Sequence, residues 1–242
     1  MIPKIIHYCW FGRGKMPAKA MYCIESWKKY LPDYELYLWN EDTFDVHQVR
    51  YVKQAYEARK FAFVTDYVRL YALYHVGGVY MDTDVEVLKS LDTLLNLPGF
   101  SGFESDTDIP TGIMAVEQHN PWAKEQLDYY TDRPFLNDDT SFDYTTNVEI
   151  ISRSMQANGF LLNNTYQVYR DCMHIFPKDY FCPKTRAGEI ILTPNTYCIH
   201  HFEGSWQPVQ YKLKKFIFHR LLGVSITNLL VGAKRQLLKR VR

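Results

Sequence analysis

The stretch from Ala62 to Val87 constrains the fold more than any other part of the chain. Its first fifteen residues are apolar on most faces of a helix, which is typical of a helix buried inside a domain. Gly77 and Gly78 are predicted to end this helix, because glycine readily adopts the left-handed conformation that a helix end needs. A short apolar strand then runs directly into Asp82-Thr83-Asp84. The pattern predicts two carboxylates at the end of a core strand.

Asp82 and Asp84 are separated by one residue, so a turn after the strand can direct both carboxylates to one divalent cation. Hard oxygen ligands suit Mn²⁺ or Mg²⁺, and such a site leaves positions open for a diphosphate. A solvated Asp-x-Asp turn is the alternative interpretation. Asp66 and Arg69 lie three residues apart on the preceding helix and hence on one face, where a structural ion pair is the alternative to a functional role.

Two motifs, Thr65-Asp66-x-x-Arg69 and the run from Gly77 to Asp84, resemble the signature of DXD-containing sugar transferases, glycosyltransferase family 32. They are also similar to the catalytic domain of the large clostridial glucosylating toxins. The resemblance covers roughly residues 2–95 and returns near residues 197–206. It implies a GT-A fold of the α/β class and sugar transfer from a nucleotide-sugar donor with retention of anomeric configuration.

The resemblance also implies roles for individual residues. The residues that would carry the chemistry are Asp82, Asp84 and Arg69. Those that would contact the donor include Asp66, Arg69, Tyr80 and Asp82, with the ribose placed near the two aspartates.

Trp10 follows the first predicted strand, and ligands of layered α/β sheets bind beyond the carboxyl ends of strands. A tryptophan exposed there can stack on a flat ring, and Trp10 is similar to the residue that stacks on the donor's uracil in the toxin relatives. Packing in the core is the alternative.

A second candidate stretch runs from His200 to Trp206. His201 and Gly204 form a His-x-x-Gly motif that resembles the carboxy-terminal metal-binding histidine of retaining GT-A transferases, so we expect His201 to join Asp82 and Asp84 at the metal. Ser205 and Trp206 resemble the serine and tryptophan that hold the donor diphosphate in the toxins. One residue separates the pair there, whereas the two are adjacent here.

Local patterns predict the remaining helices and strands and place polar loops between them. The expected helices are 17–30, 49–59, 122–130 and 146–156, with a partial helix at 91–97, and the expected strands are 2–8, 34–39, 85–87, 100–104, 112–116, 166–169, 175–176 and 197–200. Loops 105–110 (Asp106, Asp108) and 131–144 (Asp138-Asp139) are acceptor-site candidates, with solvation the alternative for the first pair. Asn147 can direct an amide at the donor sugar or cap a helix.

Composition divides the chain into a body and a tail. The 242 residues fit one domain with an appendage, which we place at 1–208 and 209–242. Residues 211–242 carry nine Lys or Arg and no Asp or Glu, in a pattern of two amphipathic helices. We favour binding of this tail to a membrane surface, with docking onto the acidic body as an alternative. Nucleic-acid binding is the third possibility, but the tail contains no nucleic-acid recognition motif.

Five cysteines without a Cys-x-x-Cys pair, no signal peptide and no apolar run of about 20 residues predict a cytoplasmic protein, at most peripheral at the inner face of the membrane. The sequence thus predicts a metal-dependent retaining hexosyltransferase with Mn²⁺ or Mg²⁺ and a donor that is UDP-linked. The acceptor would be a glycan or lipid-linked glycan in surface polysaccharide synthesis. A metal-dependent nucleotide-sugar hydrolase and a non-catalytic glycan- or membrane-binding module are the alternatives.

Overall fold

The computed structural model describes residues 1–109, 112–185 and 188–204. The chain divides into a main unit, Met1–Pro183 with Leu192–Phe202, and a second unit, Lys184–Ile191 with Glu203–Arg242. The main unit holds every helix and strand described below. Ser205, Trp206 and the tail at 209–242 lie outside the described residues, and so does the predicted domain boundary.

The helices and strands predicted from local sequence patterns are present, with their ends shifted by a few residues. The strands are β1 Ile5–Cys9, β2 Glu35–Trp39, β3 Gly78–Met81, β4 Val85–Val87, β5 Gly99–Gly102, β6 Ile113–Val116, β7 Gln167–Tyr169, β8 Met173–Phe176 and β9 Cys198–His200. The helices are α1 Ala18–Tyr30, α2 Arg50–Glu57, α3 Phe61–Val76, α4 Pro121–Asp128 and α5 Asn147–Ala157, with 3₁₀ turns η1 Asp92–Leu94 and η2 Lys178–Tyr180.

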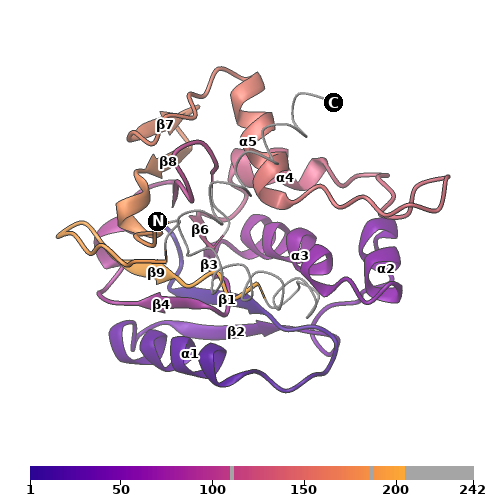
Figure 1. Ribbon diagram of the computed structural model, residues 1–242, viewed down its shortest axis with the longest axis horizontal. Coiled ribbons are helices and arrows are strands. Elements are labelled where there is room, and N and C mark those ends of the chain that lie inside the picture. Colours follow the sequence, from indigo (N-terminus) through magenta and orange to yellow (C-terminus); the bar gives the residue numbers. More distant parts are fainter. Residues whose placement is uncertain (110–111, 186–187, 205–242) are drawn as a thin grey trace, which may run out of the picture. The chain divides into compact units, whose positions relative to one another are not determined.

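A seven-stranded sheet in the order β2-β1-β3-β6-β5-β8-β7 forms the centre of the main unit (Figure 1). Its first half is parallel, because β1 pairs with β2 and with β3 in the same direction. Its second half begins where β6 runs antiparallel to β3. This sheet confirms the predicted α/β class, and it brings the carboxyl ends of β1, β2 and β3 to one edge.

The helix α3 is buried, as its sequence predicts, and packs on β1, β3 and β6. Its exit into β3 depends on the two glycines. Gly77 and Gly78 have φ angles of +74° and +108°, which side-chain-bearing residues rarely adopt. A β-carbon on Gly78 would lie 2.7 Å from the Ile5 carbonyl oxygen on β1. The glycine pair therefore sets both the turn and the close approach of β3 to β1.

A buried histidine supports the same turn. His7 on β1 is 1% exposed, and its Nε2 lies 2.8 Å from the Gly77 carbonyl oxygen. The Trp39 indole N–H donates to His7 Nδ1 at 3.1 Å. Because an indole is only a donor, Nδ1 is the acceptor and Nε2 carries the proton. A neutral His7 thus links β2, β1 and the start of β3.

A second, two-stranded sheet pairs β4 with β9 in antiparallel register. Val85 lies opposite His200, and Val87 lies opposite Cys198. Helix α1 packs on β4, where the Trp27 indole N–H donates to the Val85 carbonyl at 2.7 Å. The ribbon therefore carries a late part of the chain to the end of β3.

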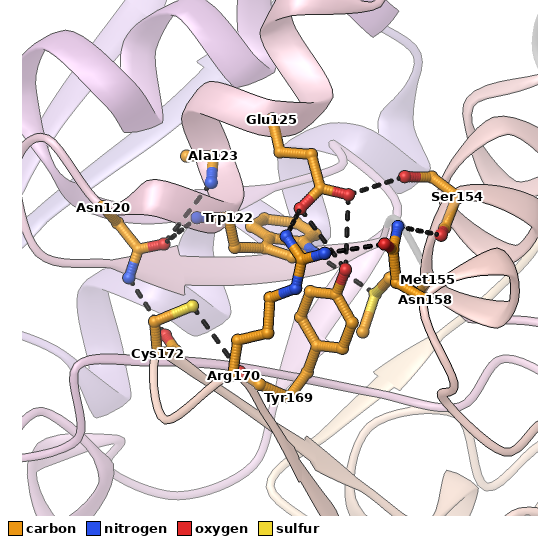
Figure 2. A network of polar contacts seen from close by, with 10 residues as sticks. All are labelled: Asn120, Trp122, Ala123, Glu125, Ser154, Met155, Asn158, Tyr169, Arg170 and Cys172. Atoms are coloured by element: carbon orange, nitrogen blue, oxygen red, sulfur yellow. Dashed lines mark hydrogen bonds and ion pairs between the residues drawn. The ribbon is translucent and has the colours of Figure 1, made fainter.

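The side of the unit that contains α4 and α5 is joined by a polar network around Glu125 (Figure 2). The Glu125 carboxylate accepts hydrogen bonds from Ser154 at 2.8 Å, from Tyr169 at 3.3 Å and from Arg170 at 3.0 Å. Arg170 also donates to Asn158 at 2.6 Å. These contacts tie α4, α5 and the turn after β7 together.

Within the part of the chain that the structure describes, no helix has the length and apolar character needed to cross a bilayer. The five cysteines are free thiols.

Candidate active site

The two predicted carboxylates lie just beyond the carboxyl end of β3, in a tight turn. The Val85 N–H donates to the Asp82 carbonyl at 3.0 Å and closes this turn. The Asp82 N–H donates to the Gly112 carbonyl at 2.8 Å, which ties the end of β3 to the residue before β6. The side chains of Asp82 and Asp84 are 22% and 18% exposed. The fold therefore fixes their backbone while leaving their oxygens open to a ligand.

Arg69 connects the helix α3 to this turn. Its NH2 lies 3.3 Å from an Asp66 oxygen and 3.3 Å from an Asp82 oxygen, and its side chain is 7% exposed. The guanidinium also lies over the Tyr80 ring, 4.8 Å from the centroid, while the Tyr80 hydroxyl donates to Asp82 at 2.7 Å. The prediction that Asp66 and Arg69 share one face is confirmed, and the structure adds that Arg69 bridges two carboxylates.

Burial shifts the charge state of the carboxylates in this cluster. Burial raises the pKa of Asp66 to about 6, although the Arg69 charge opposes the shift. Burial also raises the pKa of Asp82; Arg69 and His200 oppose this shift, and Asp84 adds to it. The three carboxylates thus lie beside the Arg69 guanidinium and the His200 imidazole. An arrangement of this kind is stabilised by a further positive charge.

His200 completes the cluster, whereas the predicted ligand His201 lies elsewhere. The Nε2 of His200 is 3.3 Å from Asp84 and 3.9 Å from Asp82. The Nε2 of His201 is instead 2.7 Å from Glu86. The structure therefore brings His200, the residue before the predicted ligand, to the two aspartates. The reason is the pairing of the strands. His200 lies opposite Val85, so its side chain is on the same face of the β4–β9 ribbon as Val85. Successive side chains of a strand point to opposite faces, so the side chain of His201 lies on the other face.

The residues present fit a divalent cation. Asp82, Asp84 and His200 each offer one ligand atom, and these atoms lie within 4.8 Å of one another. Two carboxylates and one imidazole are a donor set that Mn²⁺ accepts, and Mg²⁺ is compatible with the carboxylates. Burial lowers the pKa of His200, but Asp84 and Cys182 beside the ring outweigh the burial and hold that pKa well above its usual range. This position thus favours positive charge.

Two features of the site escaped sequence reasoning. Gly112 lies against the histidine, because a β-carbon added there would be 2.6 Å from His200 Nδ1. A hydrogen bond from the Asn147 N–H, at the first residue of α5, favours the charged form of Asp66. The Asn147 side-chain amide donates to the Tyr130 hydroxyl at 3.1 Å rather than to Asp66. In the sequence, the only signals for these two features were the glycine just before β6 and the Thr146-Asn147 start of α5.

Trp10 lies directly after β1, and its backbone N–H donates a hydrogen bond to the Trp39 carbonyl at 2.9 Å. It is partly exposed and is not a member of either hydrophobic core cluster. Its indole N–H donates to the Gly14 carbonyl at 2.5 Å. Because β1 and β3 are parallel neighbours, Trp10 and Asp82 both follow strands that end at the same sheet edge. Stacking of Trp10 on a base stays a prediction.

The acceptor-loop candidates have local partners. Asp106 pairs with Lys178 at 2.8 Å, and Asp108 accepts from the Ser105 hydroxyl at 2.7 Å. Asp139 accepts from the Ser141 hydroxyl at 2.6 Å. A hollow of about 410 Å³ reaches the start of the 131–144 loop; its lining residues are Gln48, Val49, Arg50, Tyr67, Leu127, Asp128, Tyr130, Thr131 and Asp132.

Residues 17–100 match a protein family described as "Glycosyltransferase sugar-binding region containing DXD motif". This match includes Asp66, Arg69, Asp82 and Asp84, so four residues of the site built above lie within the part of the chain that resembles this family. The match and the names of the relatives below support the transferase activity that the sequence predicts.

Two curated relatives illustrate the similarity. Inositol phosphoceramide mannosyltransferase 3 of Schizosaccharomyces pombe is 30% identical over 129 residues, which is 50% of this chain and 35% of the relative. Mannosyl phosphorylinositol ceramide synthase SUR1 of Saccharomyces cerevisiae is 24% identical over 253 residues, covering 96% of this chain and 59% of the relative. The chain thus spans less than two thirds of either relative.

Two solved structures of glycosyltransferases have a partly similar arrangement. PaToxG Glycosyltransferase has a TM-score of 0.48 at 18% identity, covering 65% of this chain and 70% of that one. The glycosyltransferase GlyE of Streptococcus pneumoniae TIGR4 has a TM-score of 0.48 at 11% identity, covering 97% of this chain and 64% of that one.

Proposed function

We propose that this chain is a metal-dependent retaining glycosyltransferase that moves a sugar from a nucleotide-sugar donor to a hydroxyl group of a glycan or lipid-linked acceptor. The observation that carries the proposal is the ligand geometry beyond β3, where Asp82, Asp84 and His200 offer ligand atoms within 4.8 Å of one another, with Arg69 beside Asp82. A divalent cation held there could bind the diphosphate of the donor.

Each residue of the cluster has a role in this proposal. Asp82, Asp84 and His200 would hold Mn²⁺ or Mg²⁺, which when bound supplies Lewis-acid stabilisation of the leaving diphosphate. Asp66 would accept hydrogen bonds from the donor ribose, and Tyr80 would keep Asp82 oriented through the 2.7 Å hydrogen bond. Arg69 would direct its remaining N–H groups toward the donor sugar or phosphates.

Residues around the cluster would bind the rest of the donor. Trp10 would stack on the nucleotide base at the same sheet edge. We propose that Ser205 and Trp206 contact the diphosphate, as the sequence predicts. The retaining reaction is proposed to proceed on one face of the sugar, with the leaving phosphate accepting the proton of the incoming hydroxyl. No protein nucleophile is therefore assigned.

The names of the curated relatives sharpen the choice of substrates. They are called mannosyltransferases of inositol phosphoceramide, which favours mannose as the transferred sugar and a phosphoinositol sphingolipid as the acceptor. This choice replaces surface polysaccharide as the first acceptor to test. A UDP-linked donor, as the sequence predicts, is to be compared directly with GDP-mannose.

Peripheral membrane contact through 209–242 is the part of the proposal that suits a lipid acceptor. The nine basic residues at 211–242 should favour anionic over neutral vesicles in cosedimentation of the full chain. Equal binding to both vesicle types would remove the electrostatic contact. A cytoplasmic location remains a prediction that fluorescence microscopy of the tagged chain can test.

A thermal-shift panel tests the donor site. UDP-glucose, UDP-galactose, UDP-N-acetylglucosamine and GDP-mannose are each added with and without Mn²⁺, because a ligand of the folded state raises the melting temperature by mass action. We expect a shift for one donor that requires Mn²⁺. Absence of any shift would favour a binding module without nucleotide-sugar affinity.

A product assay then separates transfer from hydrolysis. The donor that shifts the melting temperature is incubated with Mn²⁺ and with or without a phosphoinositol lipid, and the products are resolved by mass spectrometry. A glycosylated lipid supports the proposal. Free sugar released at the same rate with and without acceptor would identify a nucleotide-sugar hydrolase.

A further inference from the structure

Gly112 is the residue immediately before β6, and its backbone lies beside the carboxylate cluster. Strands β3 and β6 pair in antiparallel register, with Met81 opposite Ile113. The next pair along these strands is Asp82 and Gly112, and the Asp82 N–H donates to the Gly112 carbonyl oxygen at 2.8 Å. The backbone of Gly112 therefore holds the first of the proposed metal ligands in place.

The imidazole of His200 occupies the space that a side chain at position 112 would fill. A β-carbon built on Gly112 would lie 2.6 Å from Nδ1, 3.0 Å from Cγ and 3.1 Å from Cε1 of this ring. Atoms in van der Waals contact prefer separations of about 3.5–4.0 Å, so a side chain there and the ring exclude each other. These three ring atoms are the nearest ones to the added carbon, so the clash is chiefly with His200.

The ring of His200 has little room to move away. Its backbone pairs with Val85 on β4, and its N–H donates to the Phe181 carbonyl oxygen at 3.3 Å. The Phe202 ring also packs on the imidazole, with 4.1 Å between the ring centroids. A displaced imidazole would therefore have to rotate about its side-chain bonds, and that rotation would change the 3.3 Å separation between Nε2 and Asp84.

Packing rather than a hydrogen bond sets the orientation of this ring. In metal sites, the second nitrogen of a ligating histidine usually donates to a carboxylate, a carbonyl or water, which fixes the ring. Among the residues that the structure describes, the buried Nδ1 of His200 has no hydrogen-bond partner, although Cys182 lies beside the ring. Contact with the backbone of Gly112 thus takes the place of that hydrogen bond.

We propose that Gly112 is a positioning residue, whose lack of a side chain lets the His200 imidazole lie against the backbone and directs its Nε2 to Asp82 and Asp84. The effect on a bound cation rests on the proposed function, whereas the packing of the ring on Gly112 does not. The two parts therefore need separate measurements.

A double-mutant cycle tests the packing without a metal. Melting temperatures are measured in the presence of a chelator for the full chain, for Gly112→Ala, for His200→Ala and for the double variant. Gly112→Ala should lower the melting temperature by roughly 3–8 °C, because the added methyl group overpacks against the ring. In the His200→Ala background the same change should cost less than about 2 °C, because the ring is absent.

The cycle has a matched control and a result that decides against the proposal. Gly14→Ala adds the same methyl group where a β-carbon meets nothing within 4 Å, and it should change the melting temperature by less than about 2 °C. If Gly112→Ala alone does not fold, recovery of folding in the double variant is the expected result. An equal loss in both backgrounds, or no loss in either, would overturn the proposal.

Electron paramagnetic resonance of free Mn²⁺ measures the consequence for the cation, at a temperature where the proteins are folded. Gly112→Ala should weaken Mn²⁺ binding at least about tenfold, which is common for residues that position a ligand, whereas Gly14→Ala should leave it unchanged. A wild-type protein that binds no Mn²⁺ would contradict the proposed metal site, and the melting temperatures would still decide the packing. If the cycle shows the clash but Gly112→Ala binds Mn²⁺ as tightly as the wild type, the positioning role is overturned while the metal site stands.

Discussion

Two clusters in the main unit contain similar acidic and basic side chains but differ in how these side chains are paired. Around Glu125, one carboxylate accepts hydrogen bonds from Ser154, Tyr169 and Arg170 (Figure 2). Beyond β3, three carboxylates share Arg69 and His200. In the first cluster three donors surround one carboxylate, whereas in the second Asp82, Asp84 and His200 have the geometry of a cation site.

The difference shows how charge balance separates a structural cluster from a binding site. A balanced network stabilises the elements it joins and leaves nothing for a ligand to complete. In the carboxylate cluster, burial raises the pKa of Asp66 to about 6 and also raises that of Asp82. A bound cation would favour the charged forms of these carboxylates. Changes in the two clusters should therefore separate activity from stability.

The largest effect is expected from Asp82→Asn and Asp84→Asn. Each change removes a proposed metal ligand and should lower turnover by roughly 1000-fold, which corresponds to about 4 kcal/mol of transition-state stabilisation. The melting temperature should stay level or rise, because repulsion between carboxylates is reduced. Initial rates with the preferred donor, together with thermal melts, check both expectations. Glu125→Gln is the control and should retain turnover within about twofold; substantial turnover in both Asn variants would refute the metal assignment.

The next effect separates the two adjacent histidines. His200→Ala should weaken Mn²⁺ binding by about 100-fold, because it removes an atom of the ligand set. His201→Ala should cost at most about tenfold, because His201 pairs with Glu86 instead. Isothermal titration calorimetry with Mn²⁺ measures both constants. A larger loss in His201→Ala than in His200→Ala would show that His201 is the ligand and that the β4–β9 pairing differs in solution.

The balanced cluster should affect stability instead. Glu125→Ala leaves Ser154, Tyr169 and Arg170 without their acceptor and should lower the unfolding free energy by about 2 kcal/mol. For a chain of this size the melting temperature should fall by roughly 4–8 °C. Urea denaturation measures the change. Lys124→Ala, which breaks the exposed Lys124–Asp128 pair, should cost less than about 0.5 kcal/mol. Equal losses in the two variants would contradict the network's role.

The smallest effect concerns His7 and pH. Burial lowers the pKa of His7 below 6.5, and its hydrogen bond to the Gly77 carbonyl opposes the shift. The folded state thus favours the neutral imidazole, so the stability this residue contributes is present above pH 6.5 and is lost as pH falls through the folded-state pKa. Unfolding free energies between pH 7.5 and 5 measure the slope.

The matched variant for this test is His7→Asn, which keeps an acceptor for the Trp39 indole N–H but does not titrate. Its stability should depend less steeply on pH below 6.5 than that of the wild type. Identical slopes for the two proteins would show that His7 does not contribute to the pH dependence.

Much of the fold follows from local sequence. The apolar faces of α3, the Gly77-Gly78 stop and the short strand before Asp82 are periodic or conformational signals that each span a few residues. The same holds for Asp66 and Arg69, because a spacing of three residues fixes their common face on any helix. Even the sheet edge that Trp10 shares with Asp82 follows once β1 and β3 are parallel neighbours.

The sequence by itself therefore determined the α/β class, the two carboxylates at a strand end and the acidic–basic pair on the buried helix. Tertiary structure alone decided that His200 rather than His201 meets Asp84, and that the N–H of Asn147 supports Asp66. The physical reason is distance along the chain: Asp84 and His200 are more than a hundred residues apart, and strand register joins them. A difference of one residue in register exchanges the faces of a strand, and no local pattern in Ile-His-His records that choice.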